Sequence, residues 1–222
     1  MIKLIKAVLC GASAILASLA IATTSLKAGS DDFAGPYVAI HAAALGGELD
    51  GTHTDEDGAV TKGTGGSVFA IAGAEIGYNI PLSDTFFVSI GASYIDGSEE
   101  ISKGDDSADN ADVTITIADH LTVYLRPSIS VTDSSSVYAK VGYSEAALTA
   151  TGDVTGKPGD LEGATIALGT ETLFPNGAFM RTEAGMTKYD EFKLTGIGGS
   201  STATLKADPT TAYGAISLGY KF

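Results

Sequence analysis

The sequence predicts an all-β protein: a transmembrane, eight-stranded, antiparallel up-and-down β-barrel. Apolar residues alternate with small or polar ones in eight segments, as in strands that have two different faces. The connections between these segments are short and long in turn, which is the plan of an outer-membrane barrel. After residue 28 no apolar run is long enough for a spanning helix, so a closed barrel is the form in which this chain can cross a membrane.

The first 28 residues have the layout of a secretory signal peptide. Lys3 and Lys6 precede an Ala-rich apolar run at 7–22, and a small-residue cleavage site ends at Ala28. We therefore expect the segment 1–28 to be removed and one barrel domain to occupy 29–222. A retained signal anchor is the alternative, but the apolar run is shorter than the roughly 20 residues of a spanning helix.

Composition argues against several classes of function. Cys10 is the one cysteine, and it lies inside the signal segment, after Leu9 rather than after the small residue of a lipoprotein acylation site. The mature chain is then without thiols, so we expect no disulfide, no thiolate metal site and no cysteine nucleophile. Loss of the three lysines of the signal segment takes the net charge from −14 to −17, which disfavours nucleic-acid binding.

The first four strands are expected at 37–45, 68–79, 86–94 and 113–131. A short turn at 80–84, which contains Pro, Ser and Asp, joins the second strand to the third. From the second strand onward, each segment has one apolar face. These faces read Val68, Ala70, Ala72, Ala74, Ile76 and Tyr78; Phe86, Val88, Ile90, Ala92 and Tyr94; and Leu121, Val123, Leu125, Pro127, Ile129 and Val131.

The last four strands are expected at 137–144, 164–174, 178–189 and 210–222. Short turns at 132–136 and 175–177 alternate with long loops, which we expect at 46–67, 95–112, 145–163 and 190–209. The apolar faces of these strands read Val137, Ala139, Val141 and Tyr143; Ile166, Leu168 and Phe174; Met180, Ala184 and Met186; and Ile216, Leu218, Tyr220 and Phe222.

The opposite faces carry charged residues about three to six positions from a short turn. At roughly 3.3 Å per residue, these side chains would lie at one depth. In a soluble sandwich this face could simply be solvated, but its many Gly and Ser residues favour a narrow lumen in which opposite charges pair. We predict that this layer consists of Glu75, Arg126, Lys140, Glu171, Arg181 and Glu183.

Asp119 is the exception to the apolar pattern of the fourth strand. A carboxylate on the lipid-facing side is costly in the hydrocarbon. A tilted strand crosses the membrane in about 9–11 residues, and Asp119 lies further than this from the turn at 132–136. We therefore expect Asp119 to stand outside the membrane.

The chain resembles the small eight-stranded outer-membrane β-barrels of Gram-negative bacteria, the outer-membrane-protein-A-like and opacity-protein-like group. The resemblance covers most of the mature chain. It depends on the stretch GPYVAI at 35–40, on two Gly-Tyr strand ends and on the terminal ISLGYKF. It implies an outer-membrane location, lipid partners, and a last strand that the barrel assembly machinery reads as a signal through Ile216, Leu218, Tyr220 and Phe222.

The sequence offers little for catalysis. The three histidines are His41, His53 and His120, of which His41 and His120 have lumen-side parity. Some small barrels are lipid-modifying enzymes that use a His and a Ser near the outer leaflet, but here the neighbour at that spacing is Thr122. No acid is clearly placed to orient His120, and the serines lie in no elbow motif. We expect no enzymatic activity, no catalytic residues and no cofactor.

The expected loops are acidic. The loop at 46–67 carries Glu48, Asp50, Asp55, Glu56 and Asp57, and the loop at 95–112 carries seven acids, among them Asp109. The stretch GDDSADNAD at 104–112 has calcium-like spacing but lacks the turn and closing Glu of a calcium loop, so we expect no specific metal site. Divalent cations or a surface partner could still meet these acids.

These features favour a structural or surface-interaction role for the long acidic loops. A narrow, weakly conducting porin gated by the lumen charges is the first alternative, because an eight-stranded barrel is just wide enough for side chains to fill it. A lipid-modifying barrel enzyme is the second alternative.

Overall fold

The computed structural model describes residues 29–106, 111–198 and 202–222. The predicted signal peptide, 1–28, and Asp109 of the second acidic loop lie outside the described residues. Within the described residues, no helix is long and apolar enough to cross a membrane.

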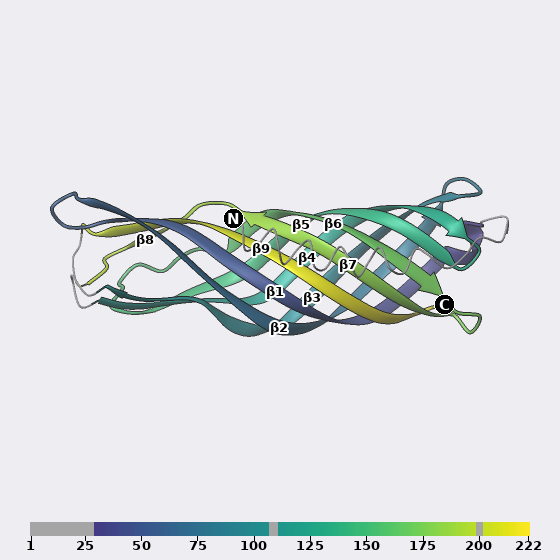
Figure 1. The fold of residues 1–222 in the computed structure, drawn as a ribbon, viewed down its shortest axis with the longest axis horizontal. Helices are drawn as coiled ribbons and strands as arrows, with labels where there is room; N and C mark the ends of the chain where they lie inside the picture. Colours follow the sequence, from purple (N-terminus) through teal and green to yellow (C-terminus); the bar gives the residue numbers. More distant parts are fainter. Residues whose placement is uncertain (1–28, 107–110, 199–201) are drawn as a thin grey trace.

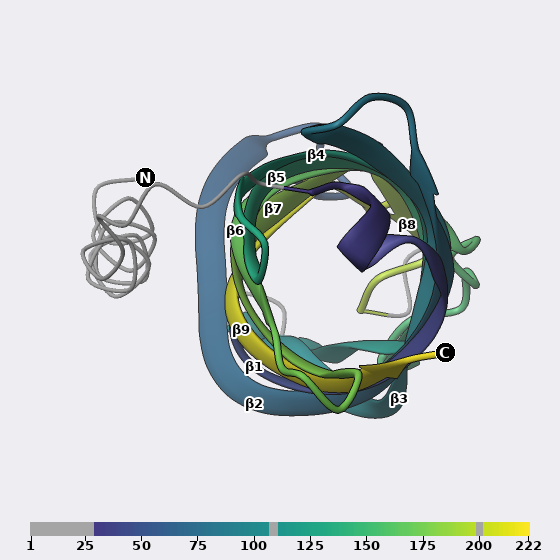
Figure 2. The same cartoon turned by 90° about the vertical axis from the view of Figure 1, so that its right-hand side faces the viewer.

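The described residues form one antiparallel sheet that closes on itself. Consecutive strands pair from β1 to β7, β7 pairs with β9, and β9 pairs with β1, so the eight long strands form a ring (Figures 1 and 2). The predicted up-and-down barrel is confirmed. The strands are β1 (Gly35–Thr54), β2 (Val60–Pro81), β3 (Phe86–Asp106), β4 (Ala111–Thr132), β5 (Ser135–Gly152), β6 (Leu161–Leu173), β7 (Ala178–Tyr189), β8 (Phe192–Thr195) and β9 (Thr204–Lys221).

The structure has a ninth, short strand where the sequence predicted a loop. β8 lies within the expected loop 190–209 and pairs with β9 from Phe192↔Ala207 to Thr195↔Thr204. Burial alternates along β8, since Phe192 and Leu194 are buried while Lys193 and Thr195 are exposed. Four residues are too few for a period of two to be distinguished from chance in a sequence.

The long strands also extend well beyond their predicted bounds. β1 and β2 stay paired from Gly35↔Asn79 to Thr54↔Val60, so most of the expected loop 46–67 is a hairpin. The outer parts of the strands are rich in Gly and Thr, which weakens the apolar signal without preventing backbone pairing. The long hairpins all project from one end of the barrel, opposite the end where the C-terminus lies (Figure 1).

The outside of the barrel carries an apolar band. Ile40 is 67% exposed and Leu168 is 66% exposed, which are values expected of side chains that face lipid rather than water. On the outer side of this band, Tyr94 donates a hydrogen bond to Asp119 Oδ1 at 2.8 Å. Because a carboxylate is costly in the hydrocarbon, we interpret this pair as lying at the outer boundary of the membrane, and the position of Asp119 outside it stays a prediction.

Candidate functional site

Two arginines and two glutamates form the centre of the lumen. Arg181 donates hydrogen bonds to Glu75 and to Glu171. Arg126 lies 3.4 Å from Glu171 and 3.8 Å from Glu75. All four side chains are at most 7% exposed. Opposite charges that are removed from water in this way are stable only as hydrogen-bonded partners.

A second ion pair lies beside this centre. Lys140 Nζ is 2.8 Å from Glu183 Oε1, and the hydroxyls of Tyr213 and Tyr138 donate to the same carboxylate at 2.7 and 3.0 Å. The structure therefore brings together all six residues of the predicted charge layer. Their positions on five different strands follow from lumen-side parity, which the sequence already showed.

Aromatic rings fill the space between the charges, and no local sequence pattern predicts this arrangement. The guanidinium groups of Arg181 and Arg126 lie 4.4 and 5.2 Å from the centroid of the Tyr37 ring, a cation–π arrangement. The Tyr37 hydroxyl lies 2.7 Å from that of Tyr124. A Cβ atom at Gly77 would collide with the Tyr37 hydroxyl, so the small lumen residues make room for these rings.

The periplasmic mouth is closed by a short 3-10 turn, η2 (Asp31–Phe33), which projects into the opening in Figure 2. Phe33 is fully buried and stacks on Phe87 at a centroid distance of 5.0 Å. Asn79 Nδ2 donates to the Phe33 carbonyl at 2.8 Å, and Asn79 Oδ1 accepts from the Ser89 hydroxyl at 2.6 Å. We call η2 with its stacked Phe33 the Phe33 plug. Arg126 Nε donates to Ser89 at 3.2 Å, so the Phe33 plug is connected to the charge layer. Phe87, a large ring on a small and polar face, was the one signal of this plug in the sequence.

The outer end of the lumen is filled by an apolar core. β8 and the segments around it lie inside the hairpins that project from the membrane, and their buried side chains pack together. The core consists of Leu49, Ile115, Ala146, Leu148, Leu161, Tyr189, Phe192, Leu194, Ile197, Ala203 and Ala207. The lumen is therefore occupied at three levels: the Phe33 plug, the charge layer and this outer core.

The barrel wall has a window between β2 and β3. Pairing of these two strands stops at Gly73↔Ile95, and beyond the window Ser67 Oγ donates to the Glu100 carbonyl at 3.1 Å. The register of β3 against β4 shifts between Ile95 and Ser98. Gly97, at the shift, has φ +138°, a conformation that favours glycine. This bulge turns β3 away from β2 and interrupts the ladder.

A cavity of about 110 Å³ lies behind the window. Inward-facing Phe69 and Ile71 line it together with outward-facing Ala70 and Ala72, so the cavity reaches into the wall. It shares Ile71, Ile95 and His120 with a deeper lumen cavity of about 50 Å³.

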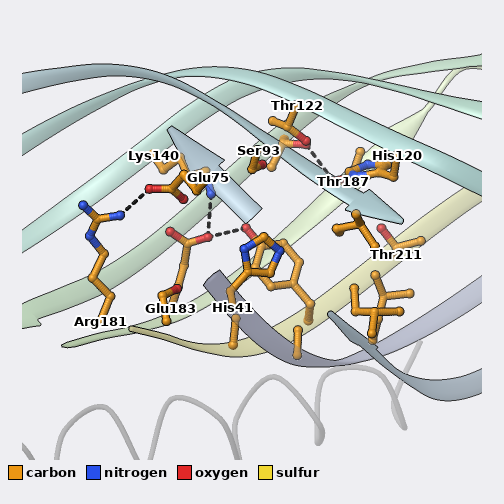
Figure 3. Close-up of a pocket in the computed structure, with 18 residues that line it drawn as sticks. His41, Glu75, Ser93, His120, Thr122, Lys140, Arg181, Glu183, Thr187 and Thr211 are labelled. Atoms are coloured by element: carbon orange, nitrogen blue, oxygen red, sulfur yellow. Dashed lines mark hydrogen bonds and ion pairs between the residues drawn. The ribbon is translucent and has the colours of Figure 1, made fainter. Parts of the chain in front are cut away.

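The deeper cavity contains two of the three histidines. His41 and His120 line it, with the ion-paired residues on one side of His41 and a group of threonines near His120 (Figure 3). Both ring nitrogens of His120 are buried and have no hydrogen-bond partner in the structure. His53 lies elsewhere, in the outer part of β1 opposite Thr61.

A row of hydroxyls runs along the wall of the deeper cavity. Thr122 and Ser144 are 2.8 Å apart, Ser144 and Thr165 are 2.5 Å apart, and Thr165 and Thr187 are 2.7 Å apart. These groups lie on four neighbouring strands, β4 to β7. Because they bond to one another, the row is largely satisfied without a ligand.

The remaining predicted residues lie on the outer surface. Ile216, Leu218 and Tyr220 of β9, together with Phe222, are exposed on the lipid-facing side. Among the described residues, no group of three or more His, Cys, Asp or Glu side chains is arranged to hold a metal ion.

A closed antiparallel ring with an apolar exterior and a charged interior defines an integral outer-membrane β-barrel. The chain belongs to the family of the outer membrane protein beta-barrel domain, whose sequence profile matches residues 13–222. This membership places the protein in the outer membrane of a Gram-negative bacterium, in contact with its lipids.

Solved structures support the same fold. The outer membrane protein OprG from Pseudomonas aeruginosa is 17% identical, with 85% of this chain and 96% of that chain covered and a TM-score of 0.56. The outer membrane protein AlkL, solved in lipid bilayers, is 16% identical, with 85% and 92% covered and a TM-score of 0.51. At these identities the likeness shows the fold alone. No curated protein sequence matches the chain.

Proposed function

We propose that this protein is a surface-facing barrel that presents an ordered, acidic extension to the medium or to a cationic partner, while its lumen stays closed to ions. The observation that supports this proposal most directly is the apolar core of the outer part. Leu194 is completely buried and Ile115 is 2% exposed, although Leu194 lies in the short outer strand β8 and Ile115 in the outer part of β4. Such a core holds the acid-bearing hairpins in fixed positions, as a binding platform requires.

Two acids at the tip of the β1–β2 hairpin face outward. Glu56 and Asp57 are exposed at the tip of the β1–β2 hairpin. Asp55 has a structural task there, since its Oδ1 accepts from the backbone N–H of Ala59 at 2.8 Å. An excess of one charge sign steers partners of the opposite sign, and the attraction weakens as salt rises.

The platform is tested by binding of a lysine-rich peptide to the full barrel in nanodiscs of uncharged lipid. We expect the double substitution Glu56→Lys and Asp57→Lys to weaken binding severalfold at low salt. The matched control is Asp31→Lys with Asp32→Lys, the same change of charge at the periplasmic end, where both residues are exposed. Equal loss in both variants would mean that only net charge matters, and the platform would be rejected.

A porin is the second candidate, because the lumen charges could open as a gate. The three occupied levels of the lumen favour a closed barrel instead. If the charge layer alone blocks conduction, replacing Arg126 and Lys140 with Met should raise the single-channel current. Unchanged current in this double variant would reject the charge layer as a gate.

An enzyme is the third candidate, and the surroundings of His120 do not favour it. Catalysis by this histidine needs a group that orients its ring, yet neither ring nitrogen has a hydrogen-bond partner. The enzyme hypothesis requires His120→Ala to abolish a measurable change in lipid acylation, and we expect no such change.

The exposed apolar residues of β9 support a separate role in assembly, as the family resemblance implies. We expect Phe222→Ser to lower the fraction of barrel assembled in cells while refolding of the purified chain into detergent is unchanged. Lys221→Ala is the control at the neighbouring position. If Phe222→Ser lowers assembly in cells and refolding in detergent equally, Phe222 acts on stability and not on recognition by the assembly machinery.

A further inference from the structure

His120 is a half-buried side chain of the lumen whose polar atoms lack partners. The atoms Nδ1 and Nε2 are both shielded from solvent and make no hydrogen bond. The ring packs edge-on against Tyr189 with the centroids 6.1 Å apart, which fixes its position without satisfying its polar atoms. Leaving such groups unpaired costs free energy, so a ligand that pairs with them would recover it.

The two cavities share the lining residues Leu45, Ile71, Ile95, His120 and Thr211, and both have mixed linings. Near the window the outer cavity adds Phe69 and Ile117, with Asp96 and Asp119 at its rim. Toward the charge layer the deeper cavity adds Thr122 and the neighbouring hydroxyls. A molecule in the joined space would have an apolar body near the window and a polar group at the imidazole.

The charges around the deeper cavity argue for an uncharged ligand. Lys140 and Glu183 form an ion pair, and Arg181 binds Glu75. These charges balance one another within the layer, although Arg181 Nη2 makes no hydrogen bond. A neutral imidazole has one donor and one acceptor nitrogen, and a hydroxyl group matches it because it can also donate and accept.

We propose that the joined cavity at His120 binds a small uncharged alcohol or phenol, with its apolar body near the window and its hydroxyl hydrogen-bonded to the imidazole. The volumes of about 110 and 50 Å³ set the size of the ligand. An apolar cavity of about 150 Å³ accommodates benzene, so a single ring or a short chain fits. This inference concerns the lumen and is independent of the proposed acidic platform.

Fluorine NMR on the full barrel in nanodiscs tests the proposal with two probes, 4-fluorophenol and fluorobenzene. They differ by the hydroxyl alone, and empty nanodiscs correct for partition into lipid. We expect saturable binding of 4-fluorophenol that is roughly threefold to tenfold tighter than that of fluorobenzene, the range of one neutral hydrogen bond.

Two variants locate the site. His120→Leu should bring the affinity for 4-fluorophenol down to that for fluorobenzene and leave fluorobenzene binding in place. Ile71→Trp should exclude both probes, because Ile71 lines both cavities. Ser130→Ala is the control, a buried lumen hydroxyl that also lacks a partner but lines neither cavity.

Each outcome supports or overturns the proposal only when the protein has the β-strand spectrum and the gel mobility of a folded barrel. Absence of saturable 4-fluorophenol binding would overturn the proposal. So would an unchanged preference for the phenol in His120→Leu, or equal effects of His120→Leu and Ser130→Ala. Loss of binding in Ile71→Trp alone would leave a cavity without a role for His120, which also contradicts the stated site.

Discussion

Arg181 is a buried member of the ionic cluster at the centre of the lumen. It is 2% exposed and is bound to two carboxylates, Glu75 and Glu171, that are themselves buried. Removing one member of a buried ionic cluster leaves charge without a partner, whereas an exposed pair adds little. The location of a charge therefore matters more than the number of ion pairs.

Arg181→Met is expected to lower the free energy of unfolding by about 3–5 kcal/mol. Lys206→Met is the matched control, because Lys206 also pairs with a glutamate, Glu191, at 3.1 Å, but both partners are about half exposed. That control should change stability by less than about 1 kcal/mol. Urea titration of refolded barrels in lipid measures both, and equal losses would contradict the buried network.

Among the elements, β8 shows how a loop becomes part of the core. Leu194 is completely buried, while Lys193 beside it is exposed on the other face. A charge at position 194 should detach β8 from the apolar core, and a charge at position 193 should be tolerated.

We expect Leu194→Asp to make the segment around β8 sensitive to subtilisin in intact barrels, with cleavage at least tenfold faster than in the wild type. Lys193→Asp should be cleaved at the wild-type rate. Cleavage products identified by mass spectrometry give the site. Resistance of Leu194→Asp would mean that β8 does not need the apolar core.

The long strands follow from a local sequence pattern, whereas the window and the Phe33 plug do not. Alternation identified the eight long strands and the lumen parity of residues such as Arg126, because a strand has a strict period of two. The window was out of reach, since it depends on a bulge at Gly97 and on pairing partners that no local pattern reveals. The plug was missed for the same reason, because Phe33 and Phe87 meet only in the closed ring.

At the scale of the whole molecule, the barrel is divided by depth. The periplasmic mouth holds the Phe33 plug, the middle holds paired charges, and the outer end holds an apolar core that supports acidic hairpins. Each level is held together by a different interaction. In the proposed function, the membrane part anchors the protein and the outer part contacts the surroundings.

The most direct test of this account is the single-channel current of the folded, mature barrel in a planar lipid bilayer. We expect no discrete openings at moderate voltage, because the lumen is occupied at three levels. Gel mobility and protease resistance must show that the inserted protein is folded. Discrete, reproducible openings from such protein would contradict the closed lumen and make the charge layer the gate of a pore.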